Sequence, residues 1–437
     1  MPRIPTALIR KAHAIDALLP ALLAPCRDLQ TAQNELRWLR EHIEGVAKAR
    51  RARGDVLAKG AMLRQLVSDR TQGKPLQYLL GTEYFGELEL RCRPGVLIPR
   101  ADTAASVTHL VSLLRKAHKL PAELRVLDLC TGTGCISLLF QHELLCARDD
   151  VDVRILGVDV SVRALKLAAH NLQRLSRNKQ LKIKGQTRFI QADVLINPFT
   201  GRFGTIPPLK TALNYADQPQ FWDILISNPP YISPSAFWKT TTRSVRAFEP
   251  KLALVPPPTL KQTDEQQGDL FYPRLLEIAR DVEAKVVLLE VADIEQALRI
   301  AHRARQLDIF DGIEIWREQP NSSTTPVVEN DFAVVGEGNA RSVLCWRGPG
   351  TSWLGRTATA TSTPKDADRL FRSHCATLAD VQNLAPPKQL ALEPQFDTRL
   401  FRENGNYRPL RHPVLQTALN HTNDQHEDAE TNTGEKQ

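Results

Sequence analysis

Residues 125–135 read RVLDLCTGTGC, and this stretch decides the fold. The largely apolar run 126–129 predicts a buried strand, and Gly132 and Gly134 after it predict a tight turn into a helix. Glycines at this place let a ligand approach the backbone at the carboxyl end of a strand, beside a helix N-terminus. The spacing is not the GxGxxG dinucleotide fingerprint, and the Lys-Ser or Lys-Thr pair of a P-loop is missing. The stretch therefore predicts a nucleotide-binding site of another type.

Two further predicted strands are followed by an acidic residue. The run 153–158 leads into Asp159, and the run 187–191 is followed by Ala192 and Asp193. An acid after the second strand can accept hydrogen bonds from ribose hydroxyls, and one after the third strand can face an adenine amino group. Since no second phosphate-binding device is visible, these features favour S-adenosylmethionine over a dinucleotide.

Beyond residue 124, apolar runs alternate with helical segments, which is typical of a mostly parallel, doubly wound α/β sheet. We expect two late strands, 309–316 and 341–346, to form an antiparallel edge, and 197–220 and 317–330 to be long loops. The expected strands are 125–129, 153–158, 187–191, 223–227 and 285–290, and the expected helices are 134–146, 161–176, 270–282 and 293–306.

The region before the sheet has a different pattern. Leu36, Leu39 and Ile43 recur at helical spacing, and residues 1–80 are expected to be all helical. Between residues 84 and 98 the apolar period changes to two, which predicts a β-hairpin with Pro94-Gly95 as its turn.

The fourth strand ends in Ser227-Asn228-Pro229-Pro230-Tyr231. The two prolines fix φ and remove two backbone donors, so the turn is rigid. Asn228 then offers its amide oxygen and the Asn-Pro peptide offers a second acceptor. Two fixed acceptors suit an NH₂ group, whose lone pair they turn toward an electrophilic methyl group. Tyr231 would form one wall of the pocket. These residues do not decide whether the target nitrogen belongs to an amide or to a nucleic-acid base.

Composition limits the class of protein. The 437 residues carry a net charge of +8 and include seven cysteines without a CxxC pair, so neither a disulfide framework nor a zinc site is expected. No apolar run reaches the roughly 18 residues that a spanning helix needs. The first 15 residues hold basic side chains and no acid before Asp16, which is compatible with a mitochondrial transit peptide. A cytoplasmic location is the alternative.

The motif 228–231 with the upstream turn resembles the class I methyltransferases that modify a planar exocyclic or amide nitrogen. Three more segments are similar to the HemK/PrmC family: KPLQY at 74–78 with Gly81 and Phe85, VLIPRADT at 96–103, and FEPKLAL at 248–254. Members of that family methylate the glutamine of the Gly-Gly-Gln motif in peptide-chain release factors. The resemblance implies a Rossmann-like, seven-stranded, mostly parallel sheet and a eukaryotic, mitochondrial member.

The resemblance also implies the domains and the partners. Residues 1–80 would be a helical domain that docks the substrate, 81–103 a hairpin linker, 104–348 the adenosylmethionine-dependent methyltransferase domain, and 349–437 an extension with a disordered acidic end. The cofactor would be S-adenosylmethionine, with S-adenosylhomocysteine as product and no metal. The partner would be a release factor. We expect a monomer with no direct nucleic-acid binding and no membrane attachment.

The family's site residues carry over by position. Residues that would grip the glutamine amide and serve in catalysis are Asn228, Pro229, Pro230 and Tyr231. Those that would line the cofactor site are Asp128, Cys130, Thr131, Gly132, Thr133, Gly134, Asp159, Asp193 and Asn228. The chain departs from the family at Cys130, where bacterial members usually have glycine, and at Ala101-Asp102, which replaces the usual Pro-Glu.

Two alternatives remain at this point. One is an N6-adenine DNA or RNA base methyltransferase, which would need a basic groove and a base-flipping pocket. The other is a catalytically silent binding protein that keeps the methyltransferase fold. The block from Leu76 to Thr103 favours glutamine as the target, and the intact turn and Asn-Pro-Pro-Tyr motif disfavour a silent protein.

Overall fold

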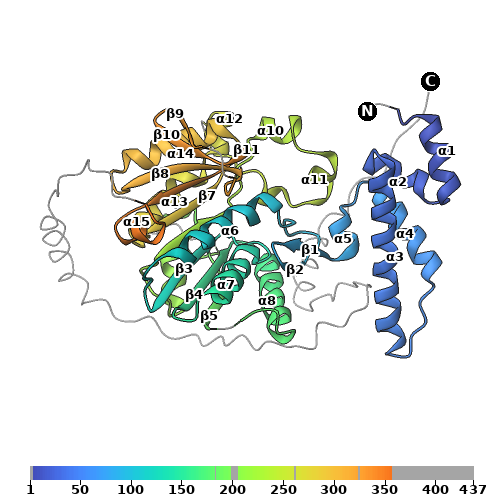
Figure 1. Ribbon diagram of the computed structural model, residues 1–437, viewed down its shortest axis with the longest axis horizontal. Coiled ribbons are helices and arrows are strands. Elements are labelled where there is room, and N and C mark those ends of the chain that lie inside the picture. Colours follow the sequence, from blue (N-terminus) through green and yellow to red (C-terminus); the bar gives the residue numbers. More distant parts are fainter. Residues whose placement is uncertain (1–2, 183, 198–204, 260–261, 323–324, 357–437) are drawn as a thin grey trace, which may run out of the picture. The chain divides into compact units, whose positions relative to one another are not determined.

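The computed structural model describes residues 3–356 except 183, 198–204, 260–261 and 323–324 (Figure 1). The chain begins with helices, as the spacing predicts for residues 1–80. Leu22, Leu36 and Leu39 are buried in a core that these helices share. The Arg70 guanidinium donates to both oxygens of the Glu35 carboxylate at 2.7 and 2.8 Å, which joins two of the helices. The five helices are α1 (Thr6–Ile15), α2 (Leu19–Cys26), α3 (Leu29–Arg51), α4 (Lys59–Thr71) and α5 (Leu76–Leu80).

A two-stranded antiparallel hairpin of β1 (Thr82–Phe85) and β2 (Leu88–Arg91) follows. The predicted position of its turn is wrong. The connection lies at Gly86, whose φ is +57°, while Pro94-Gly95 forms a separate turn in which the Val96 amide donates to the Arg93 carbonyl. Both sites carry a glycine with positive φ, so the local turn signal does not show which one joins paired strands.

The main sheet has nine strands in the order β5-β4-β3-β6-β7-β11-β8-β10-β9. β11 is antiparallel to both β7 and β8, while β5, β4, β3, β6 and β7 are mutually parallel. The strand order reverses between β3 and β6, which brings the carboxyl ends of these two strands side by side. The strands are β3 (Glu123–Leu129), β4 (Asp152–Asp159), β5 (Gly185–Gln191), β6 (Ile224–Ser227), β7 (Val286–Glu290), β8 (Gly312–Gln319), β9 (Val327–Glu329), β10 (Phe332–Val335) and β11 (Glu337–Trp346).

Helices cover both faces of the sheet, which confirms the doubly wound α/β class (Figure 1). Consecutive residues of β3 point to opposite faces: Val126 packs in the core with α6 and α7, and Leu127 packs in the core with α13 and α14. The helices of this part are α6 (Ala101–Lys116), α7 (Cys135–Ala147), α8 (Val162–Arg177), α9 (Leu209–Tyr215), α10 (Pro234–Lys239), α11 (Arg243–Phe248), the 3₁₀ turn η1 (Lys251–Ala253), α12 (Asp264–Gly268), α13 (Phe271–Asp281), α14 (Ile294–Gln306) and α15 (Pro349–Trp353).

The sheet is larger than the seven strands predicted. The expected pairing of 309–316 with 341–346 is confirmed by β8 and β11, but β10 and β9 extend the sheet beyond β8. The prediction of a loop over 317–330 is therefore wrong for 317–319, which end β8, and for 327–329, which form β9. Asn330 and Asp331 both have positive φ, at 46° and 65°, and this pair of conformations is typical of a tight hairpin turn between two short apolar strands.

Two other segments are only partly described. The predicted loop 197–220 contains α9, and its residues 198–204 lie outside the described part of the chain. The predicted extension 349–437 begins with α15, and residues 357–437, including the acidic end, lie outside the description. Among the described residues, no helix combines the length and the apolar character that crossing a membrane requires.

Candidate active site

The Gly-rich turn connects β3 to α7 through three residues with positive φ: Cys130 at 64°, Gly132 at 55° and Gly134 at 78°. Cys130 occupies a left-handed conformation that glycine adopts without strain, which explains why glycine is usual there in the family. A Cβ atom on Gly134 would lie 3.0 Å from the Ala168 Cβ, whereas a Cβ on Gly132 would meet nothing within 4 Å. Gly134 therefore serves helix packing, and Gly132 borders open space.

Asp128 lies under this turn and is completely buried. Its Oδ2 accepts hydrogen bonds from the Thr131 hydroxyl at 2.6 Å and from the hydroxyl and the amide of Ser137 at 2.6 and 3.2 Å. Its Oδ1 has no hydrogen-bond partner. Burial raises the pKa of the Asp128 carboxyl to about 6. An unsatisfied buried acceptor is costly, so Oδ1 fits a donor or a cation supplied by a ligand.

The other two predicted acids end the neighbouring strands. Asp159 of β4 accepts from the Gly132 amide at 2.9 Å and from the Ser161 amide at 2.8 Å, and burial raises the pKa of its carboxyl. Asp193 follows β5 and accepts from the Leu195 amide at 2.9 Å. Burial raises the pKa of the Cys130 thiol most, and the negative charges of Asp159, Asp128 and Asp193 raise it further. The three strand ends thus converge on the Gly-rich turn.

Backbone groups of the turn make further hydrogen bonds. The Thr131 amide donates to the Val158 carbonyl at 3.0 Å, which ties the turn to β4, and the Thr133 carbonyl accepts from the Asn171 side chain at 3.1 Å. The Gly134 amide donates to the Thr131 carbonyl at 2.9 Å. These bonds fix the shape of the turn.

The Asn-Pro-Pro-Tyr segment leaves the end of β6, next to β3. The Ser227 hydroxyl donates to the Leu129 carbonyl at 2.8 Å and joins the two strand ends. The Asn228 Nδ2 donates to the Thr103 hydroxyl oxygen at 3.1 Å, so the amide oxygen of Asn228 faces away from Thr103. Asn228, Pro229 and Tyr231 line a cavity of about 430 Å³, and Pro230 is buried outside its lining.

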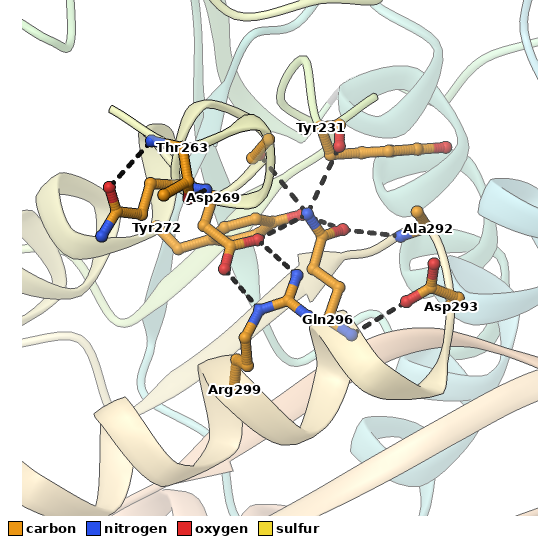
Figure 2. Close-up of polar contacts among 10 residues, drawn as sticks. Tyr231, Thr263, Asp269, Tyr272, Ala292, Asp293, Gln296 and Arg299 are labelled. Atoms are coloured by element: carbon orange, nitrogen blue, oxygen red, sulfur yellow. Dashed lines mark hydrogen bonds and ion pairs between the residues drawn. The ribbon is translucent and has the colours of Figure 1, made fainter. Parts of the chain in front are cut away.

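Side chains from α14 hold this segment from below, as Figure 2 shows. The Gln296 Nε2 donates to the Tyr231 backbone carbonyl at 3.3 Å and to Asp269 Oδ1 at 2.8 Å. The Gln296 Oε1 accepts from the Ala292 amide at 2.9 Å. Asp269 is paired with the Arg299 guanidinium at 2.6 Å. Because Gln296 is only 3% exposed, these bonds fix the backbone of Tyr231 with little competition from water.

The three segments that carry the family resemblance meet beside the cavity. The Tyr78 hydroxyl donates to the Val96 carbonyl at 2.7 Å. The buried Glu249 carboxylate accepts from the Ile98 amide at 3.1 Å and from the Arg100 guanidinium at 2.8 Å. Leu97 and Arg100 from the second segment and Leu254 from the third segment line the cavity together with Asn228.

Sequence reasoning missed three polar residues of the site: Thr103, Glu290 and Gln296. Glu290 accepts from the Tyr231 hydroxyl at 3.1 Å and is 5% exposed. A signal was available for Glu290, because an acid ends the apolar strand β7 just as Asp159 ends β4. Gln296 carries no such signal, since it is one polar residue among many on an amphipathic helix. Among the described residues, no group of three or more His, Cys, Asp or Glu could hold a metal ion.

Comparisons with known proteins agree with the family resemblance seen in the sequence. No family model matches the chain. The mitochondrial MRF1 N(5)-glutamine methyltransferase MTQ1 of Saccharomyces cerevisiae is 34% identical over 259 residues, which are 58% of this chain and 68% of that protein. The probable mitochondrial MRF1 enzyme mtq1 of Schizosaccharomyces pombe is 34% identical over 241 residues, 54% of this chain and 68% of that protein. The release factor glutamine methyltransferase of Haemophilus influenzae is 32% identical over 220 residues, 50% and 62% of the two chains.

Among solved structures, the N-terminal domain of human METTL16 in complex with SAH aligns with a TM-score of 0.37 at 15% identity, over 64% of this chain and 82% of that one. The fold class rests on the order and direction of the strands. The two yeast relatives, each 34% identical, match over 68% of their own length. The chain belongs to the family of release factor N5-glutamine methyltransferases.

Proposed function

We propose that this protein transfers a methyl group from S-adenosylmethionine to the side-chain amide nitrogen (N5) of the glutamine in the Gly-Gly-Gln motif of a peptide-chain release factor. The observation that carries this proposal is the orientation of Asn228. Its NH₂ group is engaged by Thr103, and its amide oxygen is left for a donor in the cavity that Pro229 and Tyr231 also line. An acceptor fixed in this way suits an incoming NH₂ group.

The chain's own residues supply orientation and exclusion of water. An amide nitrogen is a poor nucleophile because its lone pair is conjugated with the carbonyl group. Asn228 would accept one N–H bond with its side chain and a second with its backbone carbonyl, which directs the nitrogen toward the reacting methyl group. Tyr231 would pack on the planar amide, and the apolar wall of Leu97 and Leu254 would keep water out.

The Gly-rich turn fits the cofactor on two counts. Gly132 borders open space, and the buried Asp128 Oδ1 lacks a donor. When bound, S-adenosylmethionine supplies the electrophilic methyl group and leaves as S-adenosylhomocysteine. We assign its binding to the residues of the turn and the adjoining strand ends: Asp128, Cys130, Thr131, Gly132, Thr133, Gly134, Asp159, Asp193 and Asn228.

The release factor and the compartment are part of the proposal. The printed names of the two yeast relatives describe mitochondrial enzymes that act on MRF1. We therefore expect a mitochondrial release factor as substrate and a mitochondrial location. We assign the docking of that factor to the helices within residues 1–80, and we expect the enzyme to act as a monomer.

Replacing Asn228 tests the proposal. Asn228→Ala removes the amide oxygen, so we expect the rate of transfer to the release factor to fall by about 10²-fold or more. Binding of S-adenosylmethionine, measured by calorimetry, should persist because the turn stays intact. Asn178→Ala, at an exposed position after α8, is the matched control and should keep full activity. Radiolabel that enters nucleic acid and no release factor would refute the proposal.

A further inference from the structure

Three consecutive threonines, Thr240 to Thr242, line the same cavity as Asn228 and connect the short helices α10 and α11 (Figure 1). The Thr240 hydroxyl donates to the Ala236 carbonyl at 2.9 Å, which closes α10. The Thr242 hydroxyl accepts from the Val245 amide at 3.4 Å, which caps α11. The first and the third hydroxyl of the run are therefore already used by the two helices.

The Thr241 hydroxyl differs from both neighbours. Among the described residues it has no hydrogen-bond partner, and only the backbone carbonyl of Thr241 is bound. Thr241 is half-buried in the cavity lining, whereas Thr240 and Thr242 are exposed. A hydroxyl in this position is available to a ligand, to which it can donate one hydrogen bond and from which it can accept others.

Arg246 of α11 fixes the backbone of the threonine run. Its Nη1 donates to the Trp238 carbonyl at 2.7 Å and to the Thr241 carbonyl at 2.8 Å. The same guanidinium lies over the Trp238 ring, 5.6 Å from the ring centroid. The helix is itself held in place, because Val245 packs in the small apolar core around Phe237. Arg246 therefore determines where Thr241 stands in the cavity lining.

The other charged or aromatic polar side chains of the lining have partners. The Arg100 guanidinium is paired with Glu249 at 2.8 Å, and the Arg341 guanidinium is paired with two carboxylates, each at 3.1 Å. The Tyr231 hydroxyl donates to Glu290 at 3.1 Å. Besides the amide oxygen of Asn228, the Thr241 hydroxyl is thus the side-chain polar group that the described lining leaves for a substrate.

The target motif limits what the cavity can recognise. The two glycines of Gly-Gly-Gln have no side chains, so only their peptide N–H and C=O groups can make polar contacts with the enzyme. The proposed function already assigns Asn228 to the glutamine amide. A hydroxyl group suits the peptide backbone, because it can accept from an N–H group and donate to a C=O group.

We infer that Thr241 binds the peptide backbone of the Gly-Gly-Gln motif through its hydroxyl, and that Arg246 is a positioning residue for this contact. The inference rests on the proposed function and adds a second contact to that of Asn228. The peptide backbone does not change its charge or its bonds during methyl transfer. The contact is therefore equally strong before and during the reaction, and it lowers KM without changing kcat.

Thr241→Val tests the contact, because it keeps the shape of the side chain and removes the hydroxyl. We expect KM for the release factor to rise about tenfold, with kcat and the Kd of S-adenosylmethionine unchanged. The Kd of the release factor, measured by calorimetry without cofactor, should rise by the same factor. Thr241→Ser retains a hydroxyl and should restore most of the affinity. An unchanged KM for Thr241→Val would overturn the inference.

Thr351 offers a matched control outside the cavity lining. It is half-buried like Thr241, and its hydroxyl donates to the Asp311 carboxylate at 3.3 Å. Thr351→Val should leave KM and kcat unchanged. A rise in KM as large as that of Thr241→Val would show that the loss of a threonine hydroxyl acts through the fold, and would contradict a contact with the substrate.

Arg246→Gln tests the positioning role. If Arg246 acts through Thr241, the double variant with Thr241→Val should raise KM no further than Arg246→Gln alone. The matched control is Arg148→Gln, because the Arg148 Nη1 also donates to two backbone carbonyls, those of Leu114 and Ala117, at 3.4 and 2.6 Å. Arg148→Gln should leave KM unchanged. Effects of Arg246→Gln and Thr241→Val that multiply in the double variant would refute the positioning role.

The same assay separates this inference from the proposed function. Methylation of the Gly-Gly-Gln glutamine by the unmodified protein, together with an unchanged KM for Thr241→Val, would leave the proposed function standing and overturn the inference alone. A release factor that even the unmodified protein leaves unmethylated would refute the proposed function and, with it, the role of Thr241. Methylation with a raised KM that Thr241→Ser restores is the result we expect.

Discussion

Asp128 and Glu290 are buried carboxyl groups that no lysine or arginine side chain pairs with in an ion pair among the described residues. Each is held by hydroxyl donors, Thr131 and Ser137 around Asp128 and Tyr231 beside Glu290. Hydroxyl groups satisfy a carboxylate only in part, so burial still raises the pKa of both groups, to about 6 and about 7. Both carboxyl groups therefore change their protonation state nearer to neutral pH than an exposed carboxyl group does.

Asp128→Asn tests this description through stability. The folded-state pKa of Asp128 is raised from 3.8 to about 6, so its contribution to stability is complete below about pH 4 and is lost as pH rises through about 6. The loss is on the order of 3 kcal/mol for the ligand-free protein. We expect the free energy of unfolding in urea to fall more steeply between pH 4 and pH 8 in the unmodified protein than in Asp128→Asn, which keeps only the fall due to other groups such as Glu290.

The exposed Asp55 provides the control for this measurement. Asp55→Asn should follow the pH dependence of the unmodified protein. Parallel curves for Asp128→Asn and the unmodified protein would show that Asp128 titrates normally. Asp128→Asn should also weaken binding of S-adenosylmethionine, since an amide places N–H groups where the cofactor needs an acceptor.

Single residues could be proposed from the sequence where their expected role depends on local geometry. Asn228 and Tyr231 could be proposed from the strand end and the two prolines between them, because that geometry is local. Glu290 ends an apolar strand and Thr103 carries no such signal, but the partners of both could not be named, because their contacts depend on which strands and helices are neighbours. Thr103 lies at the start of α6 and Glu290 at the end of β7, and only the sheet order brings both to Asn228.

At the scale of elements, the Gly-rich turn between β3 and α7 combines two different requirements for glycine. A Cβ atom on Gly134 would lie only 3.0 Å from the Cβ of Ala168 in α8. The missing side chain of Gly134 therefore allows α7 to pack against α8. Gly132 has open space beside it, and its amide bonds Asp159. Gly134 is needed for helix packing, and we assign Gly132 to ligand binding.

Alanine at the two positions should therefore give different results. Gly134→Ala combines positive φ with a steric overlap, and we expect a loss of about 2 kcal/mol or more in the free energy of unfolding. Gly132→Ala adds only the backbone strain of about 1 kcal/mol, but its methyl group enters the space assigned to the cofactor. We expect the Kd of S-adenosylmethionine to rise at least tenfold. An unchanged Kd for Gly132→Ala would contradict the assigned site.

The elements themselves were predicted closely where the apolar period is long. The runs 125–129 and 153–158 became β3 and β4 within two residues at each end. Errors arose where signals were short: Gly86 was overlooked beside the stronger Pro94-Gly95 signal, and the hairpin of β9 and β10 has only three and four residues per strand. Short strands gain stability from the sheet they join, which a local pattern does not contain.

At the scale of the whole molecule, separate parts of the chain converge on one cavity. Residues 96–103, 228–231 and 248–254 are distant in sequence, yet Glu249 joins the first and third of these segments and Thr103 joins the first and second. The family resemblance singled out these segments, but neither the resemblance nor the periodicity predicted that they meet. Among the described residues that line the cavity, none belongs to helices α1 to α5.

The proposed location gives a prediction at this scale. Residues 3–11 include Arg3, Arg10 and Lys11, and α1 exposes the last two. We expect the full chain to be protected from protease inside isolated mitochondria, and replacement of all three residues by glutamine to abolish that protection. Replacing Arg50, Arg51 and Lys59 by glutamine is the control and should leave import intact. Protease sensitivity of the unmodified chain would contradict a mitochondrial location.

Mass spectrometry of the release factor's Gly-Gly-Gln peptide tests the central claim most directly. The factor is incubated with S-adenosylmethionine and either the unmodified protein, Asn228→Ala or Asn178→Ala. We expect the glutamine to gain one methyl group on its side-chain nitrogen with the unmodified protein and with Asn178→Ala, and to stay unmodified with Asn228→Ala. A glutamine that stays unmodified with the unmodified protein, or a methyl group on another residue, would contradict the proposed function.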